Sequence, residues 1–203
     1  MTIQTKEVEI LIGNNASRYI DLVAKLRLEY FKEFPYLYEG NIEYEKKYVT
    51  GYTLDKKSMI AVVKINGEVA GISTGIPLIS DSEIVADIKK GFQKKEINID
   101  EYYYYGEVII LPKFRGLGLS RKLFEAQDKI VKEWGFRHVY ILTVIRENNH
   151  PLKPKNYKSP DVLWKRLGFL QIDKTVSYHW STIQKDGSVK NNENTLQFWI
   201  KNL

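Results

Sequence analysis

Residues 108–124 read VIILPKFRGLGLSRKLF and combine three local signals. An apolar run typical of a buried strand ends at Pro112, a basic turn with two glycines follows, and the residues after it show helical periodicity. Glycines let the backbone amides of a turn approach a ligand closely, and the start of a helix favours an anion. The segment therefore predicts a strand, a tight turn and a helix, with an anion site in the turn as the functional hypothesis.

Two common nucleotide-binding patterns do not fit this turn. A Walker A loop needs a lysine and a hydroxyl residue after its second glycine, and both are missing. A dinucleotide fingerprint needs a third glycine, where Arg121 stands, and a ribose-binding acid about 20 residues further on, where the sequence reads VYIL. A plain connection without a ligand is the alternative. Three features favour the anion site: a basic residue, Arg115, before the glycines, the sharp end of the strand at Pro112, and a helix that starts directly after the turn.

The segments around the turn predict a βαβ unit. Residues 117–135 have the clearest helical period, with Gly135 at the position after the helix, and residues 137–145 form a second apolar run. A strand, a helix and a strand in this order favour parallel strands with a right-handed crossover. Asn66 and Gly67 separate two further β-prone runs and predict a type I′ hairpin.

The remaining elements complete one α+β domain over residues 1–203, since no linker or internal repeat interrupts the chain. We expect a helix that starts near Ser17, which is its predicted N-cap, and a short helix capped by Ser159 or Asp161. The other expected elements are a helix at 41–49, a helix or loop at 81–95, and two strands at 170–183 and 194–202.

Composition excludes several classes of function. The chain has 203 residues, a net charge of +6 and no cysteine, so disulfides, thiolate metal sites and a cysteine nucleophile are excluded. Acidic residues are interleaved with the scattered lysines, which favours a solvated surface over a nucleic-acid site. No apolar run approaches the ~20 residues of a membrane span, and the N-terminus is too polar for a signal peptide. We therefore expect a cytoplasmic protein with no membrane partner.

Two motifs resemble the GNAT N-acetyltransferase superfamily. Arg115, Gly116, Gly118 and Ser120 fall on its pattern [R/Q]-x-x-G-x-[G/A], although serine replaces the usual last small residue, and LWKRLGF at 163–169 is similar to its LYEKLGF segment. The resemblance covers roughly residues 58–180. It implies a central twisted mixed sheet with N-terminal helices and a C-terminal β-hairpin. HPLKPKNY and FPYLY resemble a bacterial subgroup with no assigned substrate.

The same resemblance implies acetyl-CoA as cosubstrate and no metal. The pyrophosphate of coenzyme A would lie on the amides of the turn, and the pantetheine arm along the preceding strand, at a place where two strands part. The expected cofactor-binding residues are Val108, Ile109, Ile110, Leu111, Arg115, Gly116, Leu117, Gly118, Leu119 and Ser120.

The family has two usual positions for a glutamate base. One is filled by Glu107; the other aligns with Thr143, which cannot serve. The usual tyrosine acid is replaced by Trp164, so we expect Tyr157, seven residues earlier, to donate to the leaving thiolate. Two alternatives remain open: the thiolate leaves without a protein donor, or activity is lost.

The acceptor is expected between the N-terminal helices and the last hairpin, as in the resembled fold. Phe34, Tyr36, Tyr38 and Glu39 follow the loss of helical period near Pro35 and could hold a cationic amine. The predicted function is N-acetylation of a primary amine, in a small molecule or at a peptide lysine or N-terminus, by direct attack. The alternative is a catalytically weak or inactive acyl-CoA-binding sensor. A nucleic-acid-binding domain is a third class of function, but the sequence contains no RNP, zinc or helix-turn-helix signature. Monomer and homodimer remain open.

Overall fold

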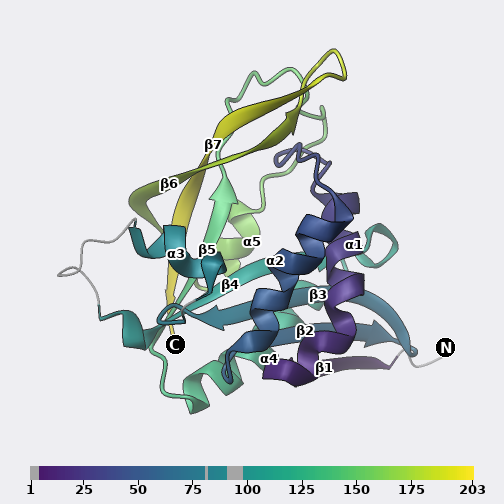
Figure 1. Ribbon diagram of the computed structural model, residues 1–203. Coiled ribbons are helices and arrows are strands. Elements are labelled where there is room, and N and C mark those ends of the chain that lie inside the picture. The colour runs from purple at the N-terminus through teal and green to yellow at the C-terminus, as the bar shows by residue number, and fades with distance from the viewer. Residues whose placement is uncertain (1–4, 81, 91–97) are drawn as a thin grey trace.

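The computed structural model describes residues 5–80, 82–90 and 98–203, which form one mixed sheet covered by helices on both faces (Figure 1). The strands are β1 (Lys6–Ile12), β2 (Met59–Ile65), β3 (Glu68–Pro77), β4 (Tyr102–Ile110), β5 (His138–Val144), β6 (Leu170–Ile183) and β7 (Val189–Asn202). The α-helices are α1 (Ile20–Tyr30), α2 (Ile42–Leu54), α3 (Glu83–Lys90), α4 (Leu119–Glu133) and α5 (Asp161–Arg166). Short 3-10 helices occupy Gly13–Tyr19, Ile99–Glu101 and Pro112–Phe114.

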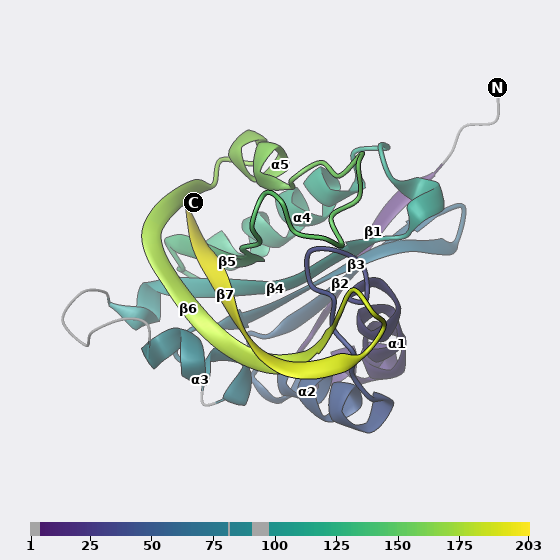
Figure 2. The same cartoon turned by 90° about the horizontal axis from the view of Figure 1, so that it is seen from above.

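The seven strands lie in the order β1-β2-β3-β4-β5-β7-β6, and only β4 and β5 run parallel. Figure 2 shows α4 and α5 on one face of the sheet and α1 and α2 on the other. In the described part of the chain, no helix is long and apolar enough to cross a membrane. The mixed α+β fold with a C-terminal hairpin is confirmed.

The β2–β3 hairpin has the predicted turn. Asn66 has φ 51° and Gly67 has φ 82°, so both central residues have the positive φ that a type I′ turn needs. Ile65 and Glu68 pair directly across it.

The predicted parallel pair is present, but β4 and β5 pair over three positions only, residues 102–104 with 138–140. Beyond Tyr104, β4 stays with β3 and β5 stays with β7. The two parallel strands therefore part in the middle of the sheet, as the resemblance implied.

Three local predictions need correction. Ser17 is no N-cap, because it lies in a 3-10 helix and α1 begins only at Ile20 without a side-chain cap. The helical period of residues 117–135 predicts Ala126 on the apolar face of α4, whereas the structure buries Phe124 and Gln127 and leaves Ala126 only partly buried. Strand β1 was not predicted, and β7 starts at Val189 instead of residue 194.

Two helix predictions are refined. Neither predicted cap of α5 is its N-cap, because Pro160 holds that position and no side chain caps the helix; the Ser159 hydroxyl accepts from the Asp161 N–H at 3.3 Å. The 81–95 segment contains α3 at Glu83–Lys90, while residue 81 and residues 91–95 lie outside the described residues.

Candidate active site

Where β4 and β5 part, the sheet opens into a cavity of about 180 Å³, here called the slot cavity. Strand β4 forms one wall, β5 the other, and α5 with the segment before it closes the end. Its lining residues are Phe31, Pro35, Tyr36, Tyr105, Gly106, Glu107, Val108, Phe124, Ile141, Leu142, Thr143, Val144, Tyr157, Ser159, Pro160, Asp161 and Trp164.

A second cavity of about 320 Å³, here called the aromatic cavity, lies between α1, α2 and the β6–β7 hairpin. Its rings come from Phe31, Tyr36, Tyr38, Tyr44, Tyr48, Tyr104, Tyr178 and Trp180. The rest of the wall consists of Arg27, Glu83, Ile84, Gly106, Glu107, Leu142, His179 and Leu196.

The two cavities share part of their walls, namely Phe31, Tyr36, Gly106, Glu107 and Leu142. Of these five residues, only Glu107 and Tyr36 have ionisable side chains. Two molecules that entered from the two cavities would therefore meet beside a carboxylate and a phenol.

A β-bulge places Glu107 at this junction. Ser73 pairs with Val108 and Gly75 with Tyr105, so Gly106 and Glu107 together face the one residue between them on β3, Thr74. A Cβ on Gly106 would lie 1.9 Å from the Tyr52 hydroxyl, so glycine is needed there.

Glu107 is 4% exposed as a residue, and its carboxylate accepts hydrogen bonds from two neighbours. The Arg27 guanidinium reaches one carboxylate oxygen, and the Thr74 hydroxyl reaches the other. The backbone N–H of Glu107 also donates to Thr74 Oγ1 at 3.0 Å. The carboxylate is therefore fixed in orientation by α1 and β3.

Arg27 links Glu107 to a second buried carboxylate. Its guanidinium lies 4.2 Å from the ring centre of Tyr48 and 4.9 Å from that of Phe31, and it also donates to Glu45. Burial alone would lower the pKa of Arg27, but Glu107, followed by Tyr48 and Glu45, raises it well above its usual value. Two carboxylates thus share one guanidinium, and the surplus carboxylate favours a cation in the adjoining aromatic cavity.

The predicted acceptor residues divide into two pairs. Tyr36 and Tyr38 lie in the wall of the aromatic cavity, and the Tyr38 hydroxyl donates to Glu45. Phe34 and Glu39 are not part of that wall: Phe34 packs against Tyr157 at 4.7 Å between ring centres, and Glu39 pairs with a surface lysine.

Backbone contacts hold the Tyr36 segment in place. Arg146 donates to the carbonyl oxygens of Pro35 at 2.7 Å and Tyr36 at 3.0 Å. The indole N–H of Trp180 donates to the same Tyr36 oxygen at 3.2 Å. No sequence pattern indicates Arg146, because its acceptors are main-chain atoms more than 100 positions away.

Tyr157 and Trp164 both lie in the slot cavity and not in the aromatic cavity. Burial, and then the charge of Asp161, raises the pKa of Tyr157. Trp164 is 6% exposed, and its indole N–H has no hydrogen-bond partner among the described residues. The Thr143 hydroxyl accepts from the indole of Trp199 at 2.9 Å and so belongs to a structural contact.

The glycine turn before α4 leaves open space beside its backbone. Gly116 and Gly118 have φ 81° and φ 75°, and a Cβ on either would meet no atom within 4 Å. The first backbone bond of α4 runs from Lys122 N–H to Gly118 O at 3.2 Å, so the amides just before it have no acceptor within the helix. The pyrophosphate of coenzyme A fits this arrangement, because it needs several convergent N–H donors and no side chain in the way.

A comparison with models of known protein families gives the same family that the two sequence motifs resemble. The chain matches the model of the Acetyltransferase (GNAT) family over residues 22–153. A search of curated proteins finds no match.

Solved structures share the fold at low sequence identity. A ribosomal-protein-alanine N-acetyltransferase from Brucella melitensis has a TM-score of 0.59 and 14% identity over 96% of this chain and 99% of that one. An acetyltransferase of the GNAT family from Streptococcus pneumoniae has a TM-score of 0.55 and 15% identity over 97% and 100%. A Salmonella typhimurium protein, solved with its cofactor acetyl-CoA, has a TM-score of 0.58 and 12% identity over 97% and 94%.

Proposed function

Because the chain belongs to the GNAT acetyltransferase family, we propose that it transfers the acetyl group of acetyl-CoA to a primary amine held in the aromatic cavity. The observation that carries this proposal is the common wall of the two cavities, where Glu107 stands. A thioester in the slot cavity and an amine in the aromatic cavity would meet there.

For the cofactor, we propose the strand residues 108–111 and the turn residues 115–120 as the binding site. Within the described residues, β4 beyond Tyr104 has no pairing on its β5 side, so its backbone groups are available to the amides of pantetheine. The open turn and the first amides of α4 would hold the pyrophosphate.

For the acceptor, the aromatic rings and the surplus carboxylate favour a molecule with an ammonium group. Ring faces stabilise a cation by ~0.5–2 kcal/mol each, depending on how far it is desolvated. The cavity is bounded by Tyr36, Tyr38, Tyr48 and Trp180, which suits a small amine or the end of a peptide.

In the reaction, the amine nitrogen attacks the thioester carbonyl and Glu107 takes the proton, directly or through water. A carboxylate has about four lone-pair sites, and Arg27 and Thr74 use two of them, so Glu107 can still accept from the amine. Tyr157, which the sequence analysis expects as a donor to the sulfur, lines the slot cavity.

Thiol release from acetyl-CoA tests the proposal. The chain has no cysteine, so a thiol reagent detects coenzyme A without background from the protein. We expect amine-dependent release with at least one of three probes: phenethylamine, spermidine and a lysine-containing peptide. Acetyl-CoA binding without turnover would favour the sensor alternative, and absence of acetyl-CoA binding in calorimetry would overturn the proposal.

A further inference from the structure

The resembled motif supplies no hydrogen-bond donor to the departing sulfur in this chain. Trp164 replaces the usual tyrosine, and both Trp164 and Tyr157 line the slot cavity alone. The carbon–sulfur bond, however, breaks where the amine reaches the thioester, which is the common wall of the two cavities. Tyr36 is the residue of that wall with a hydroxyl group.

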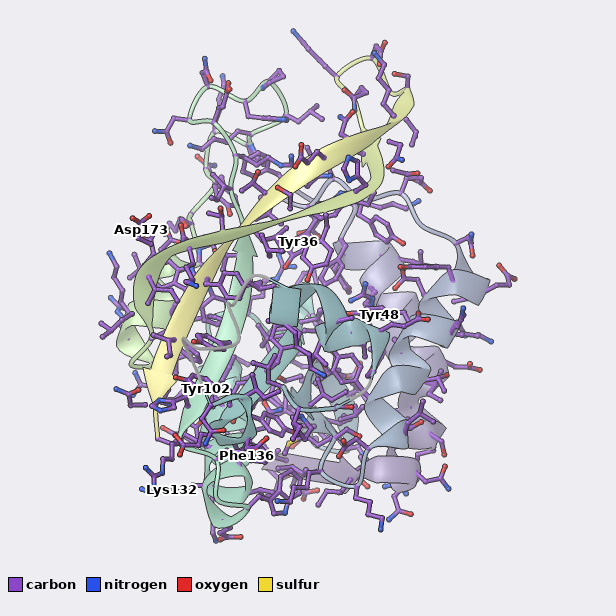
Figure 3. The ribbon with its side chains drawn as sticks, turned by 60° about the vertical axis from the view of Figure 1, so that its left-hand side comes forward. Tyr36, Tyr48, Tyr102, Lys132, Phe136 and Asp173 are labelled. Atoms are coloured by element: carbon purple, nitrogen blue, oxygen red, sulfur yellow. The ribbon has the colours of Figure 1, made fainter. Side chains whose placement is uncertain are left out.

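Ring contacts and backbone contacts both fix the position of Tyr36. Its ring stacks on Phe31 with 4.3 Å between centres and an angle of 6° between planes, and Trp180 lies 6.4 Å away. Arg146 and Trp180 hold its carbonyl oxygen. Figure 3 shows Tyr36 beneath the β6–β7 hairpin. A donor held in this way loses little conformational entropy when it makes a hydrogen bond.

We propose that the Tyr36 hydroxyl donates a hydrogen bond to the sulfur of coenzyme A as the acetyl group leaves. This inference rests on the proposed acetyl transfer. The amine lone pair forms the new carbon–nitrogen bond, the electrons of the carbon–sulfur bond go to sulfur, and the amine proton goes to Glu107. The thiolate leaves hydrogen-bonded to Tyr36 and takes up that proton through water, which gives the amide and free coenzyme A.

The protonation state of Tyr36 suits a donor. Burial, followed by the negative charge of Glu107, raises the pKa of Tyr36 to about 12 against the opposing charge of Arg27. The other titratable group that acts on it is Tyr157. A thiol ionises near pH 8.5, so the thiolate is too weak a base to remove the phenol proton. Tyr36 therefore stabilises the thiolate and keeps its own proton.

The carbonyl oxygen of the thioester has a separate source of donors. Strand β4 beyond Tyr104 presents backbone groups toward the gap left by β5. Backbone amides are the usual donors to such an oxyanion. The phenol at the junction is thus available to the sulfur.

The ionisation of bound coenzyme A tests the proposal. Infrared absorption of the S–H group measures it directly, and because the chain has no cysteine the signal comes from coenzyme A alone. In the Tyr36→Phe variant, which keeps the ring stack, we expect the pKa of the bound thiol to rise by about one unit relative to the wild type. The matched control is Tyr102→Phe, because Tyr102 lines neither cavity and its loss of a hydroxyl should leave the thiol pKa unchanged. Tyr157→Phe is measured beside it to test the donor expected from the sequence.

Each result has a definite meaning. Equal thiol pKa values in wild type and Tyr36→Phe overturn the inference, and a rise in Tyr157→Phe alone assigns the donor role to Tyr157 instead. If coenzyme A does not bind the wild type, the proposed function itself fails. A second measurement needs no variant: the wild type should prefer coenzyme A over desulfo-coenzyme A increasingly as the pH passes through the thiol range. A constant preference overturns the inference.

Discussion

Glu107 combines two features that rarely occur together in one side chain. It is nearly buried and paired with Arg27, yet it forms part of the wall of two cavities. Its place in the strand could be predicted from the chain, because a carboxylate stands between Gly106 and an apolar run. Its partner could not: Arg27 lies 80 positions away in a helix whose charged residues resemble an ordinary solvated face.

The Glu107→Gln variant tests the proposed base. Glutamine keeps the shape and the bond from Thr74, and Arg27 keeps its contact with Glu45. We expect kcat/KM to fall ~10²–10⁴-fold, as is typical when a general base is lost, with little change in acetyl-CoA affinity. The measurement is the pH profile of kcat/KM, with calorimetry for the cofactor.

Glu9→Gln serves as the control for this variant, since Glu9 pairs with Lys64 far along the chain from the site. An acidic limb that persists unchanged in Glu107→Gln would show that another group, or the amine itself, controls the step. In that case Glu107 would have only a structural role.

At the scale of elements, β4 and β5 border the gap between them, and each pairs with an antiparallel strand on its other edge. Strand β4 pairs with β3 along most of its length, and β5 pairs with β7 at seven consecutive positions. Among the described residues, each strand past Tyr104 keeps only these antiparallel bonds, β4 with β3 and β5 with β7. The facing edges of β4 and β5 are therefore left without strand partners along the gap in the described part of the chain.

Gly118→Val tests the turn at the start of α4. Gly118 has φ 75°, a backbone conformation that a β-branched residue adopts only with strain, while a Cβ there meets no neighbour. We expect acetyl-CoA binding to be lost, because the side chain would occupy the space of the phosphate, with a stability loss of ~1–2 kcal/mol. Calorimetry and denaturant unfolding measure the two effects.

Gly187→Val is the matched control, because Gly187 has φ 80° and equally open surroundings in the β6–β7 turn. It should lose similar stability and keep its acetyl-CoA affinity. Equal cofactor affinities in the two variants would contradict the assignment of the turn to the cofactor.

Hydrophobic period and turn chemistry made most elements predictable, and local conflicts explain two of the exceptions, strand β1 and the buried side of α4. Strand β1 reads KEVEILI, and its charges hide the alternation because Glu9 binds Arg18 and Lys64 at the surface. Helix α4 buries a polar residue, Gln127, so its buried side could not be found from apolar residues alone. The glycine turn was predictable because it is local. The place of the aromatic cavity, with Tyr36 and Tyr38, was expected only from the family resemblance, and Arg27 and Tyr48 in its wall were not predicted because the cavity joins segments that are distant in the chain.

At the scale of the whole molecule, tyrosine is the main polar residue of the interior. Burial raises the pKa of Tyr52, Tyr103, Tyr104 and Tyr105 well above the usual value of 10.0, and that of Tyr36 to about 12. The folded chain therefore keeps phenol protons that the unfolded chain loses. Wherever the folded state binds more protons, stability falls as the pH rises.

We expect the free energy of unfolding to be unaffected by these tyrosines below pH 10 and to fall steeply between pH 10 and about 12. Denaturant unfolding at a series of pH values measures the fall, and ultraviolet absorption of tyrosinate should rise together with loss of structure. Constant stability across this range, or tyrosinate formation in the folded state, would contradict the prediction.

The two cavities draw on different parts of the chain. The middle of the sequence, from β4 to α5, builds most of the slot cavity, whereas residues 27–48 and the β6–β7 hairpin build most of the aromatic cavity. The amine side can therefore be changed at residues that do not touch the slot cavity. Substitutions at the hairpin residues Tyr178 and His179, which line the aromatic cavity alone, should redirect the choice of amine and leave the use of acetyl-CoA intact.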